Sequence, residues 1–392
     1  MSRQLFIIIT LSILCFSCLD KQKQDDNPLL GKEVVTFVIK ELPAHHNYNK
    51  DIYISGDFES WSGGKEQFKL NKKNNQYSIS IPKHTETISY KFTKGNWDNV
   101  ECKTNGNPID NRTYSFSKTN DTVLVNIVNW NNPNQKNKPS TAAKNVHVFV
   151  EDFEMSQLNR NRKISVYLPP NYESSKTRYP VLYIQDGQNV FDVNTSYSGE
   201  WKVDETLNKM FDDTGFGLIV VAVDHGEDKR LSEYAAWDNI KYGKGEGELY
   251  LDFLVNNLKP EIDKAFRTKK EAENTGVSGS SMGGLFAHYA AVKRPDVFGK
   301  AAIFSPSFWY AEASFEFTKT HPNNSKFYYL FGEKEGQEMV DDANKMIELM
   351  KSNGFSEENI HKKIVPNGTH SESFWKTEFE EAITWLFKIN KQ

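Results

Sequence analysis

The stretch "GVSGSSMGGLFAHYAAVKRP", Gly276 to Pro295, decides the fold. Ser281 lies at the centre of Gly279-Ser280-Ser281-Met282-Gly283, a G-x-S-x-G pattern. The residues before Ser281 are compatible with a short strand, and the apolar run after it predicts a helix that ends before Pro295. A strand, a sharp turn and a helix form the context in which this pattern places a serine on a strained turn. We therefore expect Ser281 to be an exposed nucleophile at the end of a sheet rather than one serine of an ordinary turn.

The hydrophobic pattern changes twice along the 392 residues. Residues 33–130 alternate apolar and polar side chains in short runs separated by Gly, Asn and Pro, which predicts a small all-β sandwich. Residues 131–145 are polar and contain two prolines, so we interpret them as a linker. From residue 146 to 392, apolar strands alternate with long helical runs such as "GELYLDFLVNNLKPEIDKAF". Such alternation is typical of an α/β domain with a mostly parallel sheet.

The first eighteen residues resemble a lipoprotein signal peptide. Arg3 is followed by an apolar run that is too short for a membrane-spanning helix, and Cys18 follows a small residue. We expect cleavage before Cys18, lipidation of Cys18, a polar tether over residues 19–32, and a location in the cell envelope, anchored to the outer membrane on its periplasmic or surface face. The alternative is an ordinary secretory signal cleaved nearby, because Cys15 at the −3 position is an imperfect match.

Composition and charge exclude some classes of partner. The chain is 38% hydrophobic with a formal net charge of −4, and it has no long basic tract, which argues against a nucleic-acid partner. Cys15 and Cys18 lie in the leader, so Cys102 has no partner for an intrachain disulfide. The nine histidines have no metal-ligand spacing beyond the adjacent His45 and His46, which we expect in a loop. We predict neither a metal nor a cofactor.

A serine hydroxyl becomes a good nucleophile when a histidine removes its proton and an acid holds that histidine in the correct tautomer. In an α/β-hydrolase fold the chain order is nucleophile, acid, histidine. His370, in "PNGTHSESFW", follows an expected strand and precedes the last helix, so we assign it to the triad. We expect His288 to be a packing or surface residue, His321 to lie in a solvated loop and His361 to open a strand.

The positions of expected strands also indicate the acid and the oxyanion hole. The loop after the apolar strand near residue 330 offers Glu333 and Glu335, and the spacing favours Glu335. An oxyanion hole requires two backbone N–H groups. One is that of Met282, directly after the nucleophile, and we nominate Gln188, after "PVLYIQDG", for the other.

Four segments carry a family resemblance: "RYPVLYIQDGQNVFD", "VSGSSMGGLFAHYAAVKRPDVFGKAAIFSPSFW", "FGEKEG" and "GTHSESFW". They resemble the putative-esterase family, which groups esterase D-like enzymes, enterochelin esterases, and the feruloyl and acetyl-xylan esterases of carbohydrate esterase family one. The resemblance extends from Val146 to Lys388 and implies an α/β-hydrolase fold with serine-esterase chemistry. It places the nucleophile on Ser281, the acid on Glu335 and the histidine on His370, although the family's acid is often Asp.

The first domain has a resemblance of its own. The stretches "IYISGDFESWSGGKEQFKL", "ISYKFTKGNWDNVE" and "NPIDNRTYSF" resemble starch-binding and glycogen-binding modules, which are immunoglobulin-like sandwiches in which exposed tryptophans stack on sugar rings. Trp61 and Trp97, with Asn111 and Arg112, occupy the matching stretches. The resemblance implies that Trp97 and Trp61 bind sugar. The alternative is that Trp61 is structural and that the module only packs against the esterase domain.

Three functional hypotheses follow. The first is a lipid-anchored serine esterase that removes feruloyl or acetyl groups from polysaccharide through an acyl-enzyme. The second is a siderophore esterase, which would need a cationic site that Lys229 and Arg230 could supply. The third is a glycan-binding lipoprotein with an inactive hydrolase domain. The aromatic stretch "SPSFWY" and Trp237 are candidates for an acyl pocket, although aromatic residues are more often core residues.

Overall fold

The computed structural model describes residues 33–59, 61–83, 85–116, 121–132, 139–196 and 198–390. The signal peptide, Cys18 and the tether lie outside these residues. Within the described part of the chain, no helix is both long enough and apolar enough to cross a bilayer. The lipid anchor and the envelope location stay predictions.

Residues 34–130 form a β domain of two main sheets and a short ribbon. The four-stranded sheet has the order β3-β4-β1-β8, the three-stranded sheet the order β2-β5-β7, and β6 pairs with β9. Side chains of β4 alternate between buried and less buried positions, as period-two patterning predicts. The strands are β1 (Val34–Glu41), β2 (Tyr53–Gly56), β3 (Asn71–Lys73), β4 (Gln76–Pro82), β5 (Thr87–Thr93), β6 (Glu101–Cys102), β7 (Arg112–Ser115), β8 (Asp121–Asn126) and β9 (Asn129–Trp130).

The second domain is built on an eight-stranded sheet of order β10-β11-β13-β12-β14-β15-β16-β17. Strands β10 and β11 pair antiparallel, as do β11 and β13, and the other neighbours are parallel. The expected α/β architecture with a mostly parallel sheet is therefore confirmed. The strands are β10 (Val146–Met155), β11 (Arg160–Tyr167), β12 (Val181–Gln185), β13 (Ile219–Val223), β14 (Thr275–Ser280), β15 (Lys300–Phe304), β16 (Lys326–Gly332) and β17 (Ile360–Val365).

Helices cover both faces of this sheet. Two helices pack with one hydrophobic cluster on one face, α1 (Val203–Thr214) and α8 (Glu372–Phe387). The others pack with a larger cluster on the opposite face: α2 (Arg230–Tyr234), α3 (Gly247–Phe253), α4 (Lys259–Ala265), α5 (Met282–Lys293), α6 (Ala313–Lys319) and α7 (Gln337–Ser352). The predicted helix over residues 247–266 forms, but a π-helical turn, Leu254–Leu258, separates α3 from α4.

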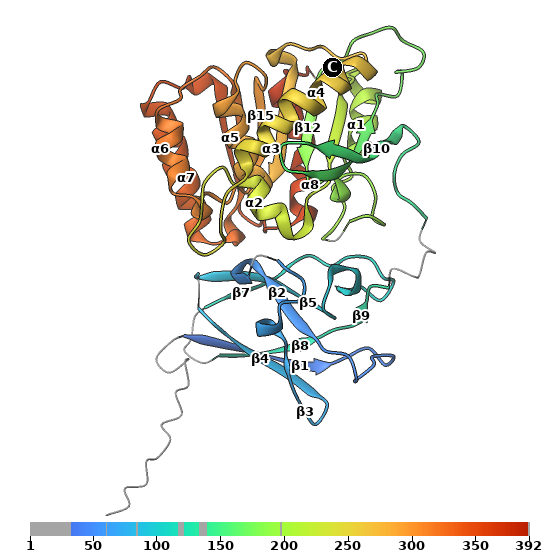
Figure 1. Ribbon diagram of the computed structural model, residues 1–392, viewed down its shortest axis with the longest axis vertical. Helices are drawn as coiled ribbons and strands as arrows, with labels where there is room; N and C mark the ends of the chain where they lie inside the picture. The colour runs from blue at the N-terminus through green and yellow to red at the C-terminus, as the bar shows by residue number, and fades with distance from the viewer. Residues whose placement is uncertain are drawn as a thin grey trace, which may run out of the picture.

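The β domain packs against the hydrolase domain through its three-stranded sheet. Figure 1 shows β2, β5 and β7 on the side of the β domain that faces the hydrolase domain. Nearly every residue of β5 is buried, because Ile88, Tyr90 and Phe92 point into the β-domain core while the alternate residues point the other way. Asn111 Nδ2 donates a hydrogen bond to the His370 carbonyl oxygen at 3.4 Å, and Lys241 Nζ donates one to the Phe58 carbonyl at 3.2 Å. The domain contact therefore reaches the predicted catalytic histidine.

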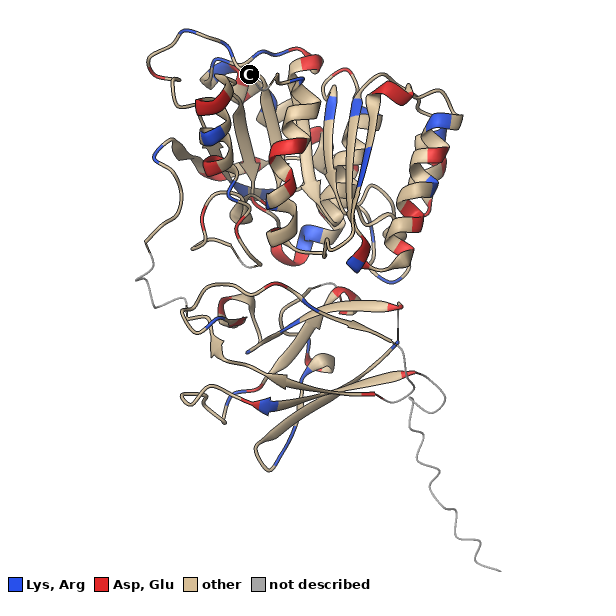
Figure 2. Ribbon diagram, turned by 180° about the vertical axis from the view of Figure 1, so that it is seen from behind, with Lys and Arg blue, Asp and Glu red and all other residues tan. Residues whose placement is uncertain are grey.

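Charged residues of both signs are interspersed over the two domains. Lys and Arg alternate with Asp and Glu along the helices of the hydrolase domain (Figure 2). The ion pairs on α1 illustrate this mixing, since Lys209 lies 2.8 Å from Asp213 one helical turn away. The absence of a partner nucleic acid stays a prediction that rests on the net charge and on the lack of a basic tract.

Candidate active site

Ser281 lies on the turn between β14 and α5. Its φ of 56° and ψ of −120° are outside the regions that non-glycine residues favour, so the turn is strained. The turn closes tightly because a Cβ on Gly279 would lie 2.5 Å from the backbone of Gly283. A Cβ on Gly284 would lie 2.9 Å from the Phe304 carbonyl oxygen, which explains how close α5 packs to β15. The local geometry is that of a nucleophile elbow.

The acid and the histidine come from the loops after β16 and β17. His370 Nδ1 lies 3.1 Å from Glu335 Oε2, and the Glu335 side chain is fully buried. Glu333, the alternative acid, is exposed. A proton on Nδ1 shared with the carboxylate leaves Nε2 of His370 as the basic nitrogen. Of the two candidate acids, the geometry therefore favours Glu335.

Glu335 is held by groups that the sequence did not identify. Its Oε1 accepts hydrogen bonds from Ser305 Oγ at 2.6 Å and from the Gly332 backbone N–H at 2.9 Å. Ser305 Oγ in turn accepts a hydrogen bond from Trp375 Nε1 at 2.8 Å. Ser305 has a φ of 45°, an uncommon value for serine. The only sequence signal for Ser305 is its position directly after the expected strand that neighbours the nucleophile strand.

The hydrogen bond found for Ser281 Oγ goes to Ser307 Oγ, at 3.2 Å. Ser281 and His370 nevertheless line the same two cavities, so a rotation of the serine side chain would redirect its hydroxyl. Catalytic hydrogen bonds are often loose in the absence of substrate and tighten when substrate binds. Ser307 is thus the resting partner of the nucleophile, and sequence reasoning noted it only as part of an aromatic stretch.

The two oxyanion candidates differ in position. Met282 is the first residue of α5 and lines one of the cavities, so its N–H lies at the end of the helix that carries partial positive charge. Gln188 is buried, and its side-chain Oε1 accepts a hydrogen bond from the His225 backbone N–H at 3.2 Å. Gln188 lines neither of the two cavities beside Ser281, whereas its neighbours Asp186 and Asn189 line one of them. The role of Gln188 stays a prediction.

Three other histidines have structural environments. His288 is fully buried between Tyr329 Oη and Thr318 Oγ1, at 2.7 Å from each, and burial lowers its pKa to about 3. The His321 ring stacks on Phe317 at 4.2 Å. His361 stacks on Tyr328 at 4.8 Å, and burial lowers its pKa. None of the three lines the cavities beside Ser281.

The cavities beside Ser281 lie between the two domains. Cavity A has a volume of about 450 Å³ and cavity B of about 400 Å³. Both are lined by Trp61, Arg230, Leu231, Ser281 and His370. Trp97 and Asn111 line cavity B only, and Phe58 and Trp309 line cavity A only. The two tryptophans for which the resemblance implied sugar binding therefore line a cavity together with the predicted catalytic residues Ser281 and His370.

Of the aromatic residues considered for an acyl pocket, only some lie beside Ser281. Trp309, within "SPSFWY", is 41% exposed and lines cavity A. Phe308 and Tyr310 are buried in the core. Trp237 packs on Tyr289 and is absent from the lining of both cavities.

The basic residues proposed for an anionic ligand are already paired. Arg230 makes two hydrogen bonds to Asp186, at 2.6 and 2.8 Å, and Lys229 lies 2.8 Å from Asp228. Burial raises the pKa of Asp186 and the Arg230 guanidinium lowers it, and the net shift is downward. The positive charge of Arg230 is therefore largely neutralised before any ligand binds.

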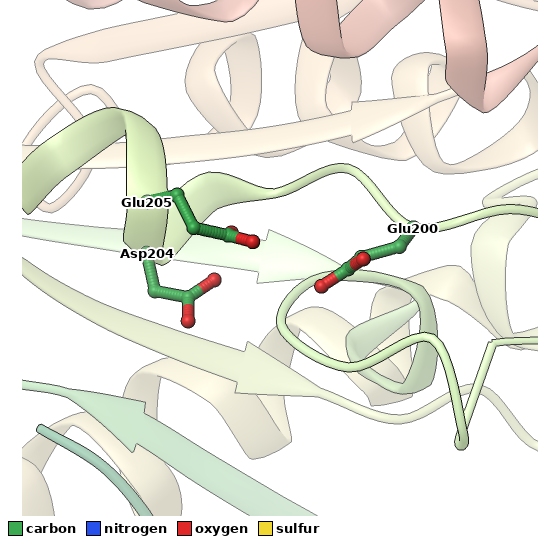
Figure 3. A group of neighbouring side chains, drawn as sticks. All are labelled: Glu200, Asp204 and Glu205. Atoms are coloured by element: carbon green, nitrogen blue, oxygen red, sulfur yellow. The ribbon is translucent and has the colours of Figure 1, made fainter. Parts of the chain in front are cut away.

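One acidic cluster among the described residues has metal-ligand spacing. Glu200, Asp204 and Glu205 bring carboxylate oxygens within 4.8 Å of one another (Figure 3). Asp204 accepts a hydrogen bond from the Ala143 N–H at 2.7 Å, and Glu200 accepts one from Thr141 Oγ1 at 2.7 Å. Burial raises the pKa of Asp204 to about 7, which favours the protonated form of this acid. The cluster joins the linker to α1, and its members do not line the two cavities.

The elbow, the paired acid and histidine, and the parallel sheet that carries them define an α/β-hydrolase. The chain belongs to the putative esterase family, whose sequence model matches residues 155–386, and it is a carboxylic ester hydrolase. It is 26% identical to protein YbbA of Bacillus subtilis over 59% of this chain and 94% of that protein. It is 29% identical to an endo-1,4-beta-xylanase/feruloyl esterase of Xylanibacter ruminicola over 57% of this chain and 29% of that protein.

Two further similarities concern siderophore enzymes. The chain is 24% identical to ferri-bacillibactin esterase BesA of Bacillus subtilis, over 39% of this chain and 56% of that protein. The structure of enterochelin esterase from Shigella flexneri matches with a TM-score of 0.54 and 12% identity, over 90% of this chain and 92% of that chain. This likeness supports the fold of both domains. The resemblance of the β domain to starch- and glycogen-binding modules stays a prediction.

Proposed function

We propose that the protein hydrolyses feruloyl or acetyl esters on carbohydrate through a covalent acyl-enzyme, with Ser281, His370 and Glu335 as the triad. The observation that carries this proposal is the contact between Glu335 and His370 beside Ser281, at the junction of two cavities. An ester has an acyl side and an alcohol side, and two cavities that meet at the nucleophile suit such a substrate.

In this mechanism His370 Nε2 takes the proton of Ser281 Oγ as the oxygen attacks the ester carbonyl. The buried Glu335 carboxylate stabilises the imidazolium that forms. The Met282 N–H donates to the developing oxyanion, together with a second N–H for which Gln188 is the candidate. His370 then protonates the leaving alcohol. In the second half of the reaction, His370 takes a proton from water as the water attacks the acyl-enzyme, and it returns this proton to Ser281 Oγ as the carboxylic acid is released.

The charge of the cavities favours a neutral carbohydrate ester over an iron-bound catecholate, which is anionic. Carboxylates in the cavity linings outnumber cations: Asp57, Glu86, Asp98, Asp186, Glu227, Asp228, Glu335, Glu338 and Glu372 against Lys65, Arg230 and Lys241. An anionic ligand would meet net repulsion in such a cleft. The similarity to a xylanase/feruloyl esterase supports the same choice.

A siderophore ester is the second candidate, because ferri-bacillibactin esterase is a relative of this chain. It would require that the substrate displace or tolerate the Arg230–Asp186 pair. The third hypothesis, an inactive hydrolase domain, is at odds with the family and with the contact between Glu335 and His370.

The test is a substrate panel with the chain from residue 19 onward: p-nitrophenyl acetate, methyl ferulate, acetylated xylan and a catecholate trilactone, each with wild type and Ser281→Ala. The proposal predicts hydrolysis of the ferulate or xylan ester that Ser281→Ala abolishes. Preference for the trilactone would instead support the second candidate function, hydrolysis of a siderophore ester. Hydrolysis that survives in Ser281→Ala would overturn the assignment of the nucleophile.

A further inference from the structure

We propose that Arg230 is a positioning residue of the oxyanion hole, and that its ion pair with Asp186 holds the loop after β12 against the first turn of α5. The inference rests on the proposed function, in which backbone N–H groups of these two segments bind the oxyanion. It gives a catalytic consequence to an ion pair beside Ser281 that the triad does not use.

The backbone of Asp186 starts the loop that carries Gln188. Its φ of 58° and ψ of 46° are left-handed, a conformation that is uncommon outside glycine. The Asn189 N–H donates a hydrogen bond to the Asp186 carbonyl oxygen at 2.9 Å, which closes a turn over Gly187 and Gln188. A Cβ on Gly187 would lie 2.7 Å from the backbone of Val223, so this turn packs on the end of β13. A change in the Asp186 backbone would therefore move the Gln188 N–H.

The side chain of Asp186 lies between α2 and the first turn of α5. Arg230 Nε donates a hydrogen bond to Oδ1 at 2.6 Å, and Arg230 Nη2 donates one to Oδ2 at 2.8 Å. A Cβ on Gly283 would lie 3.3 Å from Oδ2, so the carboxylate packs on the turn that follows Ser281. Tyr234, also on α2, accepts a hydrogen bond from the Asp186 backbone N–H at 3.1 Å. The loop and both helices thus meet at this one residue.

The charges of the pair also bear on the reaction. Asp186 and Arg230 line cavity B together with Ser281, and their side chains are 8% and 20% exposed. Negative charge develops on the oxyanion beside Ser281, and a buried carboxylate without its cation would repel that charge. Removal of one partner of a buried pair leaves the other charge uncompensated. Loss of Arg230 should therefore destabilise the transition state more than the bound substrate, and so lower kcat rather than raise KM.

Substitutions of the two partners separate geometry from charge. Arg230→Lys keeps the positive charge but cannot form the two parallel bonds, whereas Arg230→Met removes both. Asp186→Asn suits the left-handed backbone, because Asn adopts it more readily than most residues, and it removes the charge that Arg230→Met leaves unpaired. The matched control is Arg294→Met. Arg294 binds Asp296 through the same two nitrogens, at 2.8 and 2.7 Å, and neither residue lines the cavities beside Ser281.

The experiment measures hydrolysis of p-nitrophenyl acetate by the protein from residue 19 onward, with thermal unfolding followed by circular dichroism as the check on folding. We expect Arg230→Met to lower kcat at least about 100-fold and to change KM less than about threefold. Arg230→Lys should lower kcat about tenfold. Addition of Asp186→Asn to Arg230→Met should restore kcat at least about fivefold over Arg230→Met alone. Arg294→Met should keep kcat within about twofold of wild type.

The contrary results are distinct for the inference and for the proposed function. Wild-type kcat in a folded Arg230→Met variant, or a loss that Asp186→Asn does not relieve, would overturn the inference and leave the triad intact if Ser281→Ala is inactive. Should Arg230→Met fail to fold, Arg230→Lys decides the question, because an unchanged kcat there would overturn the inference equally. An active Ser281→Ala would overturn the proposed function, and the inference with it.

Discussion

At the scale of single residues, the site depends on how one buried carboxylate is shared. Glu335 offers Oε2 to His370 and Oε1 to Ser305 and Gly332. The second set of bonds fixes the direction of the carboxylate, because a carboxylate with only one partner could rotate away from the imidazole. Ser305 is therefore a positioning residue, and Trp375 holds Ser305 in turn.

The first prediction concerns the charge of Glu335. Glu335→Gln keeps the shape of the side chain but removes the negative charge that stabilises the imidazolium, so kcat should fall about 10³- to 10⁴-fold. The matched control is Glu333→Gln, which changes an exposed carboxylate two residues away and should alter kcat less than about twofold. Steady-state hydrolysis of p-nitrophenyl acetate measures both. A large loss in Glu333→Gln with a small one in Glu335→Gln would reverse the assignment.

At the scale of elements, two loops are brought together by glycines. A Cβ on Gly332, at the end of β16, would lie 2.3 Å from the Gly368 backbone, and the Lys334 backbone N–H donates a hydrogen bond to the Gly368 carbonyl at 3.0 Å. The loop of the acid and the loop of the histidine therefore touch through their main chains. The contact between Glu335 and His370 depends on that approach.

The second prediction follows from this contact. Gly332→Ala should separate the two loops, lower stability by about 1–3 kcal/mol and lower kcat at least about tenfold. Gly276→Ala is the matched control, because the nearest obstacle there is the end of a flexible side chain, Leu182 Cδ1, at 2.9 Å. Urea unfolding and ester hydrolysis measure the two effects. A stable and fully active Gly332→Ala variant would contradict the role given to the contact.

The sequence predicted these elements unevenly. It predicted the strand, turn and helix around Ser281 because a local pattern specifies them, and it placed His370 by chain order. It did not identify the roles of Ser305 and Ser307, because these roles depend on contacts between segments far apart in the chain. Nor could it place Trp61 and Trp97 in the cleft between the domains. Period-two patterning shows which side chains of a strand share a face, but it does not show which other domain packs on that face.

At the scale of the whole molecule, the β domain packs over the end of the hydrolase sheet that carries the proposed triad. Lys91 of β5 and Glu372 of α8 belong to different domains, are both buried and interact electrostatically. Burial lowers the pKa of Lys91, and burial raises the pKa of Glu372 to about 7 although Lys91 opposes that rise. Ionisable groups are costly to bury, so their position beneath the β domain indicates that the domain contact belongs to the folded state.

The third prediction uses the acid that anchors the linker. Asp204 has a pKa of about 7 in the folded protein, above its value when unfolded, so the folded state retains a proton that the unfolded state releases. The stability that Asp204 contributes is complete below pH about 4 and is lost as the pH rises through about 7. Asp204→Asn mimics the protonated acid and removes this dependence.

Other buried groups titrate with the opposite sign, since burial lowers the pKa of His225 to about 4 and that of Lys300 to about 8. The measured quantity is therefore the difference in unfolding free energy between wild type and Asp204→Asn, by urea unfolding at pH 5 and pH 8.5. Relative to the variant, the wild type should lose on the order of 2–3 kcal/mol over this range. A difference that does not change with pH would mean that Asp204 is ionised throughout.

The central claim is that Ser281 is the nucleophile and that His370 activates it. The most direct measurement is labelling with a fluorophosphonate, which reacts covalently with activated serines, followed by peptide mass spectrometry. We predict a single adduct on Ser281 in the wild type and labelling at least about 100-fold slower in His370→Ala. No adduct, an adduct on the neighbouring Ser307, or labelling of Ser281 that is indifferent to His370→Ala would contradict the account.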